Sequence, residues 1–211
     1  AKKPNPSLTA TIHGIDDESM QSGALRLSAL DVRLELFGNI ATATITASFA
    51  NPSREHLEGE FSMTLPDSAV VTGYALDVRG QMIDGVLVDP QKADTAYEAK
   101  VRAGIDPGVA TVSRANVFST RVFPILAHQG RTIRLRFVAP VHPQAGLMLP
   151  LETRKSVGRI SLEVRCEALA AVPALELPRG LEAEWKKLDG ALAASVQARD
   201  HQCSSRRISP R

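Results

Sequence analysis

The sequence has few aromatic residues, two cysteines, no long apolar run and almost no excess of charge. Aromatic side chains make up 4% of its 211 residues, so we expect an aliphatic core. Its 25 lysines and arginines against 23 aspartates and glutamates leave a net charge of +2, which does not favour a nucleic-acid partner. No stretch approaches the roughly 18 apolar residues of a membrane span, so we expect no membrane insertion by this chain.

The sequence also lacks the motifs of common enzymes. The five histidines occur in neither a His-Glu-x-x-His pattern nor beside a Cys-x-x-Cys pair. No Gly-x-Ser-x-Gly nucleophile motif and no phosphate-binding glycine loop is present. We therefore expect no catalytic residue, no metal and no cofactor, and a hydrolase with an unrecognised site is a remote alternative. The histidines are His13, His56, His128, His142 and His201.

The two cysteines allow either one disulfide or two free thiols. Cys166 falls on the apolar side of an alternating segment that begins at Ile160, and free cysteines are commonly buried. This favours a core position for Cys166, while a bridge to Cys203 stays open.

Apolar and polar residues alternate with a period of two along most of the chain, which is typical of half-buried strands. Two such runs, 32–36 and 42–49, flank Gly38-Asn39 and predict a hairpin. Many short strands separated by glycine and proline turns indicate a mainly β fold, an antiparallel β-sandwich. Further strands are expected at 60–64, 70–78, 82–88, 117–122, 132–138, 160–167 and near 181–185.

One segment departs from this alternation. Asp89-Pro90 resembles a helix start, and apolar residues then recur at spacings of three and four before Gly104. We expect one short α-helix at about 90–103. The whole chain is then divided into an N-terminal extension (1–24), a β-sandwich domain (25–141), an additional strand region on or beside it (142–200) and a polar tail or linker (201–211).

Several short motifs follow one another in a characteristic order. An aromatic-containing strand ends in Leu-Pro, a helix segment carries Ala and Tyr, and an Asn-x-Phe strand precedes a Pro-Ile turn. The residues of these motifs are Leu65, Pro66, Ala93, Ala96, Tyr97, Asn116, Phe118, Pro124 and Ile125. In this order the motifs resemble the VIT domain, the vault protein and inter-alpha-trypsin inhibitor heavy-chain domain. The closing strand ends in Phe137-Val138, where the family has a tyrosine.

The physical chemistry of these positions is structural. Pro66 and Pro124 end strands because proline has no N–H for the ladder, and the Asn116 side chain can pair with backbone at a strand edge. The resemblance implies a non-catalytic module that binds a protein partner or a neighbouring domain. It also implies the N-terminal part of a larger exported or membrane-anchored protein, hence an extracytoplasmic location. Such proteins often continue into a von Willebrand A domain, whose Asp-x-Ser-x-Ser motif is incomplete at 17–21.

Arg134 and Arg136 are the candidate binding residues outside the family motif. Period-two geometry places both side chains on the outer face of the strand 132–138, where guanidinium groups could bind sulfate, carboxylate or an acidic polysaccharide. Basic residues at 114, 121, 154, 155 and 159 could join them if their segments lie alongside. Alternatively, the two arginines pair across strands with Glu58, Glu60 or Glu163 on a solvated face.

Overall fold

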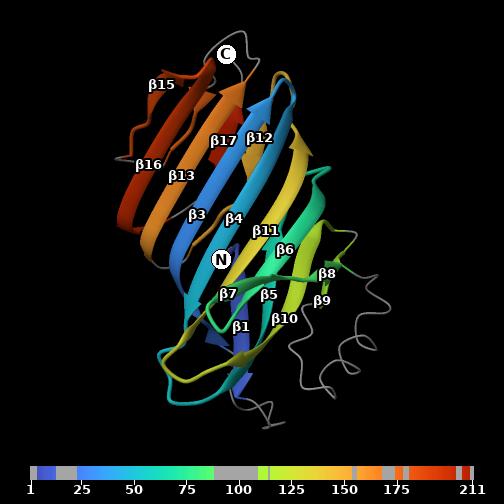
Figure 1. The fold of residues 1–211 in the computed structure, drawn as a ribbon, viewed down its shortest axis with the longest axis vertical. Helices are drawn as coiled ribbons and strands as arrows, with labels where there is room; N and C mark the ends of the chain where they lie inside the picture. Colours follow the sequence, from blue (N-terminus) through green and yellow to red (C-terminus); the bar gives the residue numbers. More distant parts are fainter. Residues whose placement is uncertain are drawn as a thin grey trace.

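The computed structural model describes residues 4–12, 23–87, 109–113, 115–153, 156–167, 174–177, 181–202 and 206–209. Within these ranges the chain forms strands in three sheets and no helix, so the mainly β prediction is confirmed (Figure 1). The helix expected at 90–103, with Ala93, Ala96 and Tyr97, lies outside the described residues. In the described part of the chain, no helix is long and apolar enough to cross a membrane.

The largest sheet has eight strands in the order β15-β16-β13-β3-β4-β11-β6-β7. Strands from the region 142–200 therefore extend the same sheet as the strands of the predicted sandwich domain. The bounds are β3 Arg26–Phe37, β4 Ile40–Ala50, β6 Val70–Val78, β7 Gln81–Asp84, β11 Gly130–Pro140, β13 Val157–Glu167, β15 Glu184–Leu188 and β16 Ala191–His201.

The second sheet has six strands in the order β2-β1-β5-β10-β9-β8, and the third has three, β12-β17-β14. The segment expected to be an N-terminal extension supplies β1 and β2. The segment expected to be a polar tail supplies β17, and its Ile208 is buried in the core. The bounds are β1 Ser7–Ile12, β2 Gly23–Ala24, β5 Leu57–Thr64, β8 Val86–Leu87, β9 Val109–Val112, β10 Val117–Ile125, β12 Leu147–Leu149, β14 Ala174–Leu175 and β17 Arg206–Ser209.

The expectation of a purely antiparallel architecture is wrong at two places. β13 runs parallel to β3, with Ser161 opposite Asp31 in register, and β8 runs parallel to β9. A parallel neighbour requires a long connection rather than a hairpin, and here more than a hundred residues separate β3 from β13. The sheets are therefore mixed.

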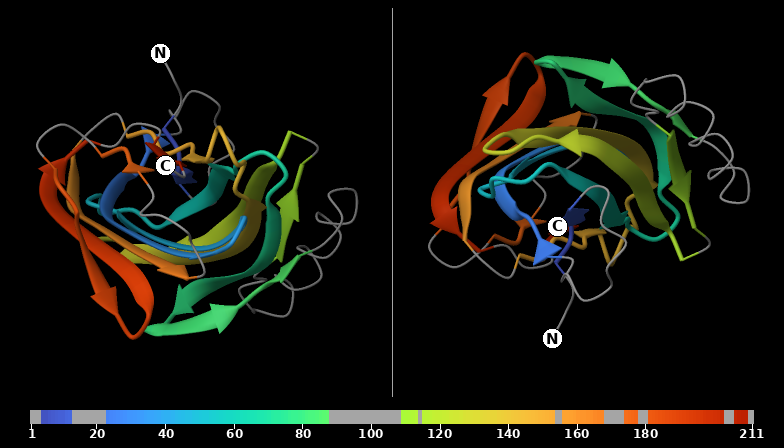
Figure 2. Two further views of the ribbon diagram at one scale, coloured as in Figure 1. Left: turned by 90° about the horizontal axis from the view of Figure 1, so that it is seen from above. Right: turned by 90° about the horizontal axis from the view of Figure 1, so that it is seen from below.

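Aromatic side chains join the two larger sheets. Phe49 on β4 meets Phe61 on β5 edge to face, and Phe61 meets Phe118 on β10, each with ring centroids 6.0 Å apart. Phe118 in turn meets Tyr74 on β6 at 5.2 Å, which returns the chain of contacts to the eight-stranded sheet. Edge-to-face geometry is the preferred arrangement of aromatic pairs. In end-on views the strands curve around this shared interior (Figure 2).

The predicted strands agree with the structure in most cases. The hairpin at Gly38-Asn39 is confirmed, with Phe37 opposite Ile40 and Gly38 at a φ of 57°. The predicted strands at 60–64, 70–78, 117–122, 132–138 and 160–167 all lie inside observed strands. The strand expected near 181–185 begins only at Glu184.

The prediction of a single strand at 82–88 is wrong, because the chain passes from the eight-stranded sheet to the six-stranded sheet at Gly85. β7 ends at Asp84 in the eight-stranded sheet, and β8 starts at Val86 in the six-stranded sheet. The Gly85 N–H donates to the carbonyl oxygen of Tyr74 at 3.0 Å, and a Cβ at Gly85 would overlap the buried Tyr74 ring. The close approach to an aromatic ring therefore requires glycine at the crossing point.

We expect Gly85→Ala to destabilise the fold by about 1–3 kcal/mol, the usual cost of forcing extra atoms into a packed core. Urea unfolding followed by circular dichroism measures this change. Gly73→Ala is the matched control, because the nearest atom to its added Cβ is Arg136 Nη2 at an ordinary 3.5 Å. Equal stability of the two variants would contradict the role assigned to Gly85.

Candidate interaction surface

The described family-motif residues lie in the interior rather than around a cleft. Leu65, Pro66, Phe118 and Ile125 are buried, and Pro124 is half-buried. Leu65 and Pro66 directly follow the end of β5, as expected, whereas the expectation that Pro124 ends a strand is wrong, because Pro124 lies within β10.

Asn116 connects two of these motifs. Its backbone has a φ of 56°, its side-chain amide donates to the carbonyl oxygen of Pro66, and its own carbonyl oxygen accepts the Leu65 N–H at 2.9 Å. Asparagine tolerates the left-handed conformation better than most residues and can bond locally to backbone. Asn116 therefore fastens the end of β5 to the turn that precedes β10.

Two further asparagines, Asn5 and Asn51, also bind backbone groups of distant strands through their side chains. The buried Asn51 side chain donates to the carbonyl oxygens of Ile125 and Leu126 at 3.3 and 3.1 Å. The Asn5 amide oxygen accepts the Thr64 N–H at 2.8 Å, and its nitrogen donates to the Thr64 carbonyl oxygen at 3.0 Å. Both begin an Asn-Pro-Ser triplet, a turn signal that says nothing about these distant partners.

The buried Arg131 is also structural. Its guanidinium donates to Asp77 at 3.1 Å and to the carbonyl oxygen of Pro124 at 2.7 Å. Because the same Asp77 oxygen also accepts the Thr132 N–H at 2.7 Å, the carboxylate joins β6 to β11.

Arg134 and Arg136 both lie on the outer face of the eight-stranded sheet, the face turned away from the aromatic contacts. The Arg134 guanidinium lies 3.9 Å from Asp84, whereas Arg136 has no carboxylate partner within the described residues. Arg121 does not join them, because β10 is in the other sheet. Residues 114, 154 and 155 lie outside the described residues.

The acidic partners suggested for these arginines are placed elsewhere. Glu58 and Glu60 are on β5 of the six-stranded sheet, and Glu163 pairs with Arg33 at 2.9 Å instead. The alternative that Arg134 and Arg136 pair with Glu58, Glu60 or Glu163 is therefore wrong.

Across β3 and β13 the outer face carries cross-strand ion pairs. Arg159 binds Asp31 through two nitrogens at 2.7 and 2.8 Å, and the Arg33–Glu163 pair lies along the same strands. Exposed pairs of this kind contribute about 0–1 kcal/mol each. Their main effect is to neutralise this part of the face.

Large apolar side chains are exposed at one end of the outer face. Phe37 is 66% exposed, Val70 64%, Leu188 53% and Ile40 42%. Phe37 and Ile40 face each other across the β3–β4 turn. Leu188 on β15 is separated from β3 by β16 and β13, and Val70 on β6 is separated from β4 by β11. We call these four residues the apolar row. Exposed apolar side chains grouped on one face are typical of protein-binding surfaces.

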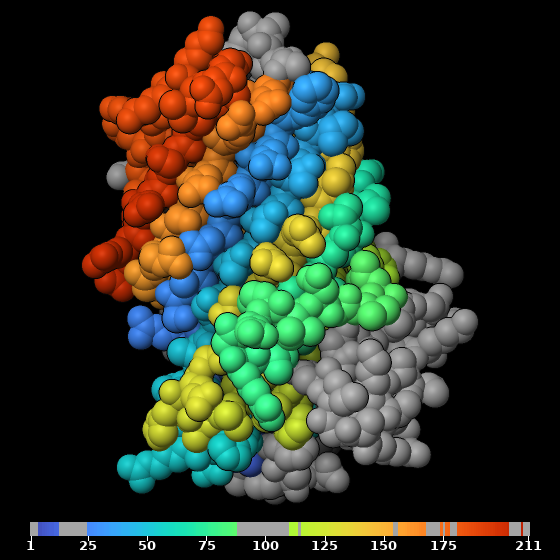
Figure 3. Space-filling model, viewed as in Figure 1, coloured from blue at the N-terminus to red at the C-terminus, as the bar shows by residue number. Residues whose placement is uncertain are grey.

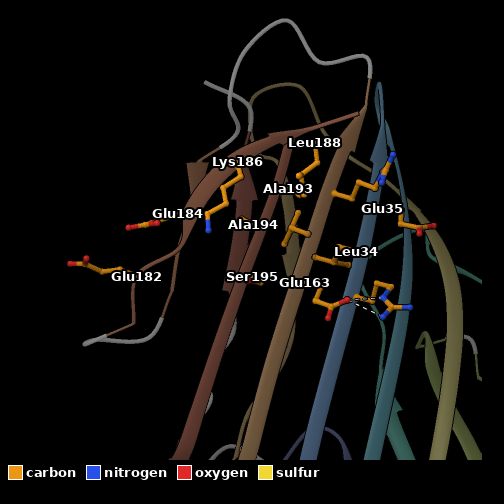
Figure 4. Close-up of a pocket in the computed structure, with 13 residues that line it drawn as sticks. Leu34, Glu35, Glu163, Glu182, Glu184, Lys186, Leu188, Ala193, Ala194 and Ser195 are labelled. Atoms are coloured by element: carbon orange, nitrogen blue, oxygen red, sulfur yellow. Dashed lines mark hydrogen bonds and ion pairs between the residues drawn. The ribbon is translucent and has the colours of Figure 1, made fainter. Parts of the chain in front are cut away.

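A groove lies beside the apolar row, between β15 and the strands β13 and β3 (Figure 4). It encloses about 650 Å³. Ala193 and Ser195 of β16 lie at its base, with Lys186 and Glu184 on the β15 side and the Arg33–Glu163 pair on the other. In the space-filling view the strands that line it, β15, β16, β13 and β3, lie side by side on the same face of the molecule (Figure 3).

Within the described ranges, no group of three or more histidine, cysteine, aspartate and glutamate side chains is placed to hold a metal ion. Cys166 is a free, buried thiol, which confirms its predicted core position. Burial raises the pKa of this thiol from its ordinary value of 9.0 to about 11, so it stays protonated near neutral pH. Cys203 lies outside the described residues.

The family is established by a match over residues 27–137 to the Vault protein inter-alpha-trypsin domain. The match covers more than half of the chain, and the chain belongs to the VIT family. No curated protein matches the sequence.

Solved structures with a similar fold include two metallopeptidases. The M1 zinc metallopeptidase of Deinococcus radiodurans is 10% identical with a TM-score of 0.48, and 88% of this chain aligns with 42% of that chain. A mutant two-domain M1 zinc metallopeptidase bound to L-tryptophan is 11% identical with a TM-score of 0.50, and 88% of this chain aligns with 43% of that chain. The chain thus spans about two fifths of these proteins. At 11% identity, the likeness to the second concerns the fold alone.

We expect Asn116→Gly to lower the free energy of unfolding by about 1 kcal/mol, because glycine keeps the positive φ but removes the hydrogen bond to Pro66. Asn116→Ala should lower it by about 1–2 kcal/mol more, because alanine disfavours that conformation. Chemical unfolding of both variants measures the difference. Equal stability of the glycine and alanine variants would contradict the conformational part of this explanation.

Proposed function

We propose that this VIT domain is a non-catalytic protein-protein interaction module that binds its partner on the outer face of the eight-stranded sheet. The observation that carries the proposal is the apolar row, whose side chains lie on the face that the core does not use. A small cluster of buried apolar contacts supplies most of the free energy in many protein interfaces. Phe37 is the central anchor, because it is the most exposed large apolar side chain of the row.

The proposal extends to the setting of the domain. Its partner is a neighbouring domain of the same protein or a separate protein, and the larger protein is exported or membrane-anchored. The resemblance to VIT proteins supports this extracytoplasmic setting. A rigid sheet surface suits such a role because it presents side chains without a conformational change.

Polyanion binding through Arg134 and Arg136 is the second candidate. It is favoured by Arg136, which has no carboxylate partner within the described residues, and by the long 3.9 Å separation between Arg134 and Asp84. Guanidinium groups bind sulfate and carboxylate through paired hydrogen bonds, so an acidic polysaccharide is a chemically suitable ligand. Such binding weakens steeply with salt, whereas apolar docking does not.

We expect Phe37→Ser/Ile40→Ser to lose the partner at physiological salt, while Arg134→Ser/Arg136→Ser retains it. The measurement is capture from an extract of the source organism by the immobilised chain, followed by mass spectrometry. Both double variants change only exposed or half-buried side chains, so circular dichroism should show an unchanged fold.

The opposite outcome would reject the apolar row as the binding surface. If the partner is lost only in the arginine variant, and the wild type binds dextran sulfate with an affinity that falls with salt, polyanion binding becomes the function. If both double variants retain every partner, the outer face is not the binding surface.

A further inference from the structure

We propose that the groove beside β15 binds an extended segment of the partner protein in which lysine or arginine alternates with small or apolar residues. The inference rests on the proposed function, since it specifies part of the same interaction face. It assigns a class of ligand to a hollow that the family motif does not include.

The groove exists because β16 carries small residues where its neighbours carry long ones. Ala193 and Ser195 lie at the base, and in register Ala193 is opposite Arg165 on one side and Lys186 on the other. Ser195 is likewise opposite Glu163 and Glu184. Long side chains on both neighbouring strands therefore stand above a base of short ones, and the hollow runs along the strand direction.

The lining side chains that form no ion pair with one another carry an excess of negative charge. Arg33 is neutralised by Glu163, and Arg165 by Glu167, each at 2.9 Å. Within the described residues, the lining side chains without an ion-pair partner are three carboxylates and one ammonium group. These are Glu35, Glu182, Glu184 and Lys186. A cationic ligand therefore has three carboxylates available and opposes only one like charge.

The shape of the groove favours an extended ligand. A strand laid along β16 directs alternate side chains toward opposite faces. Small or apolar residues of the ligand would contact Ala193, while its lysines or arginines would reach the carboxylates at the rim. The exposed Leu188 at one end of the groove joins it to the apolar row, so one partner can occupy both.

The test uses a synthetic peptide in which alanine and lysine alternate over about nine residues, roughly 30 Å when extended. We expect the full chain to bind it in low salt, as measured by calorimetry. A peptide with glutamate in place of lysine should not bind.

Glu35→Gln/Glu182→Gln/Glu184→Gln should raise the Kd of the lysine peptide about tenfold, the effect of losing three exposed ion pairs. The matched control is Glu55→Gln/Glu60→Gln/Asp67→Asn, which removes the same number of exposed carboxylates from β5 and its flanking loops. The control should bind the peptide as the wild type does.

Equal weakening in both triple variants would overturn the proposal, because binding would then depend on net charge alone. Absence of binding by the wild type would also overturn it. Neither result would affect the proposed function, which fails if the partner is lost only in the arginine variant or if both double variants of the outer face retain every protein partner. The two claims can therefore fail separately.

Discussion

The contact chain Phe49–Phe61–Phe118–Tyr74 is the interaction on which the rest of the structure depends. The sequence contains only six phenylalanines, two tyrosines and one tryptophan, and four of these nine rings meet in this single line between the two larger sheets. Aliphatic side chains fill the remaining core around them. Because each ring comes from a different strand, the contacts fix which faces of the sheets turn inward.

Fixing the inner faces also determines which face is free. Side chains alternate strictly along a strand, so every outer residue of β3, β4 and β11 is set by the inward position of its neighbours. The threonines of β4, the ion pairs of β3 and β13, and the apolar row therefore occupy one surface. The binding surface we propose is a consequence of how the core is packed, and it needs no residue of the family motif.

Local patterns in the sequence were sufficient to predict most strands. The alternation at 42–49 and the Gly38-Asn39 turn are determined by neighbouring residues, and the structure confirms the hairpin. The break at Gly85 could not be predicted in this way, since it depends on a ring eleven residues earlier in the chain. The parallel pairing of β3 with β13 is likewise set by tertiary packing, because both strands show the same alternation as their antiparallel neighbours.

The candidate site could be predicted only in part. The alternation of side chains along a strand was enough to place Arg134 and Arg136 on a common face. Their acidic neighbours depend on the order of strands in the sheet, which alternation does not determine. The groove depends on four strands, and its only local signal is the short run of small residues from Ala193 to Ser195. Asn5 and Asn51 carry a turn signal, yet each also bonds to backbone more than fifty residues away.

The most direct test of the central claim is hydrogen–deuterium exchange on the chain alone and in complex with its captured partner. The account predicts slower exchange on binding at residues 33–40 and 184–195, which contain the apolar row's centre and the groove. Protection confined to 57–64 and 117–125, the strands β5 and β10 of the other sheet, would contradict it.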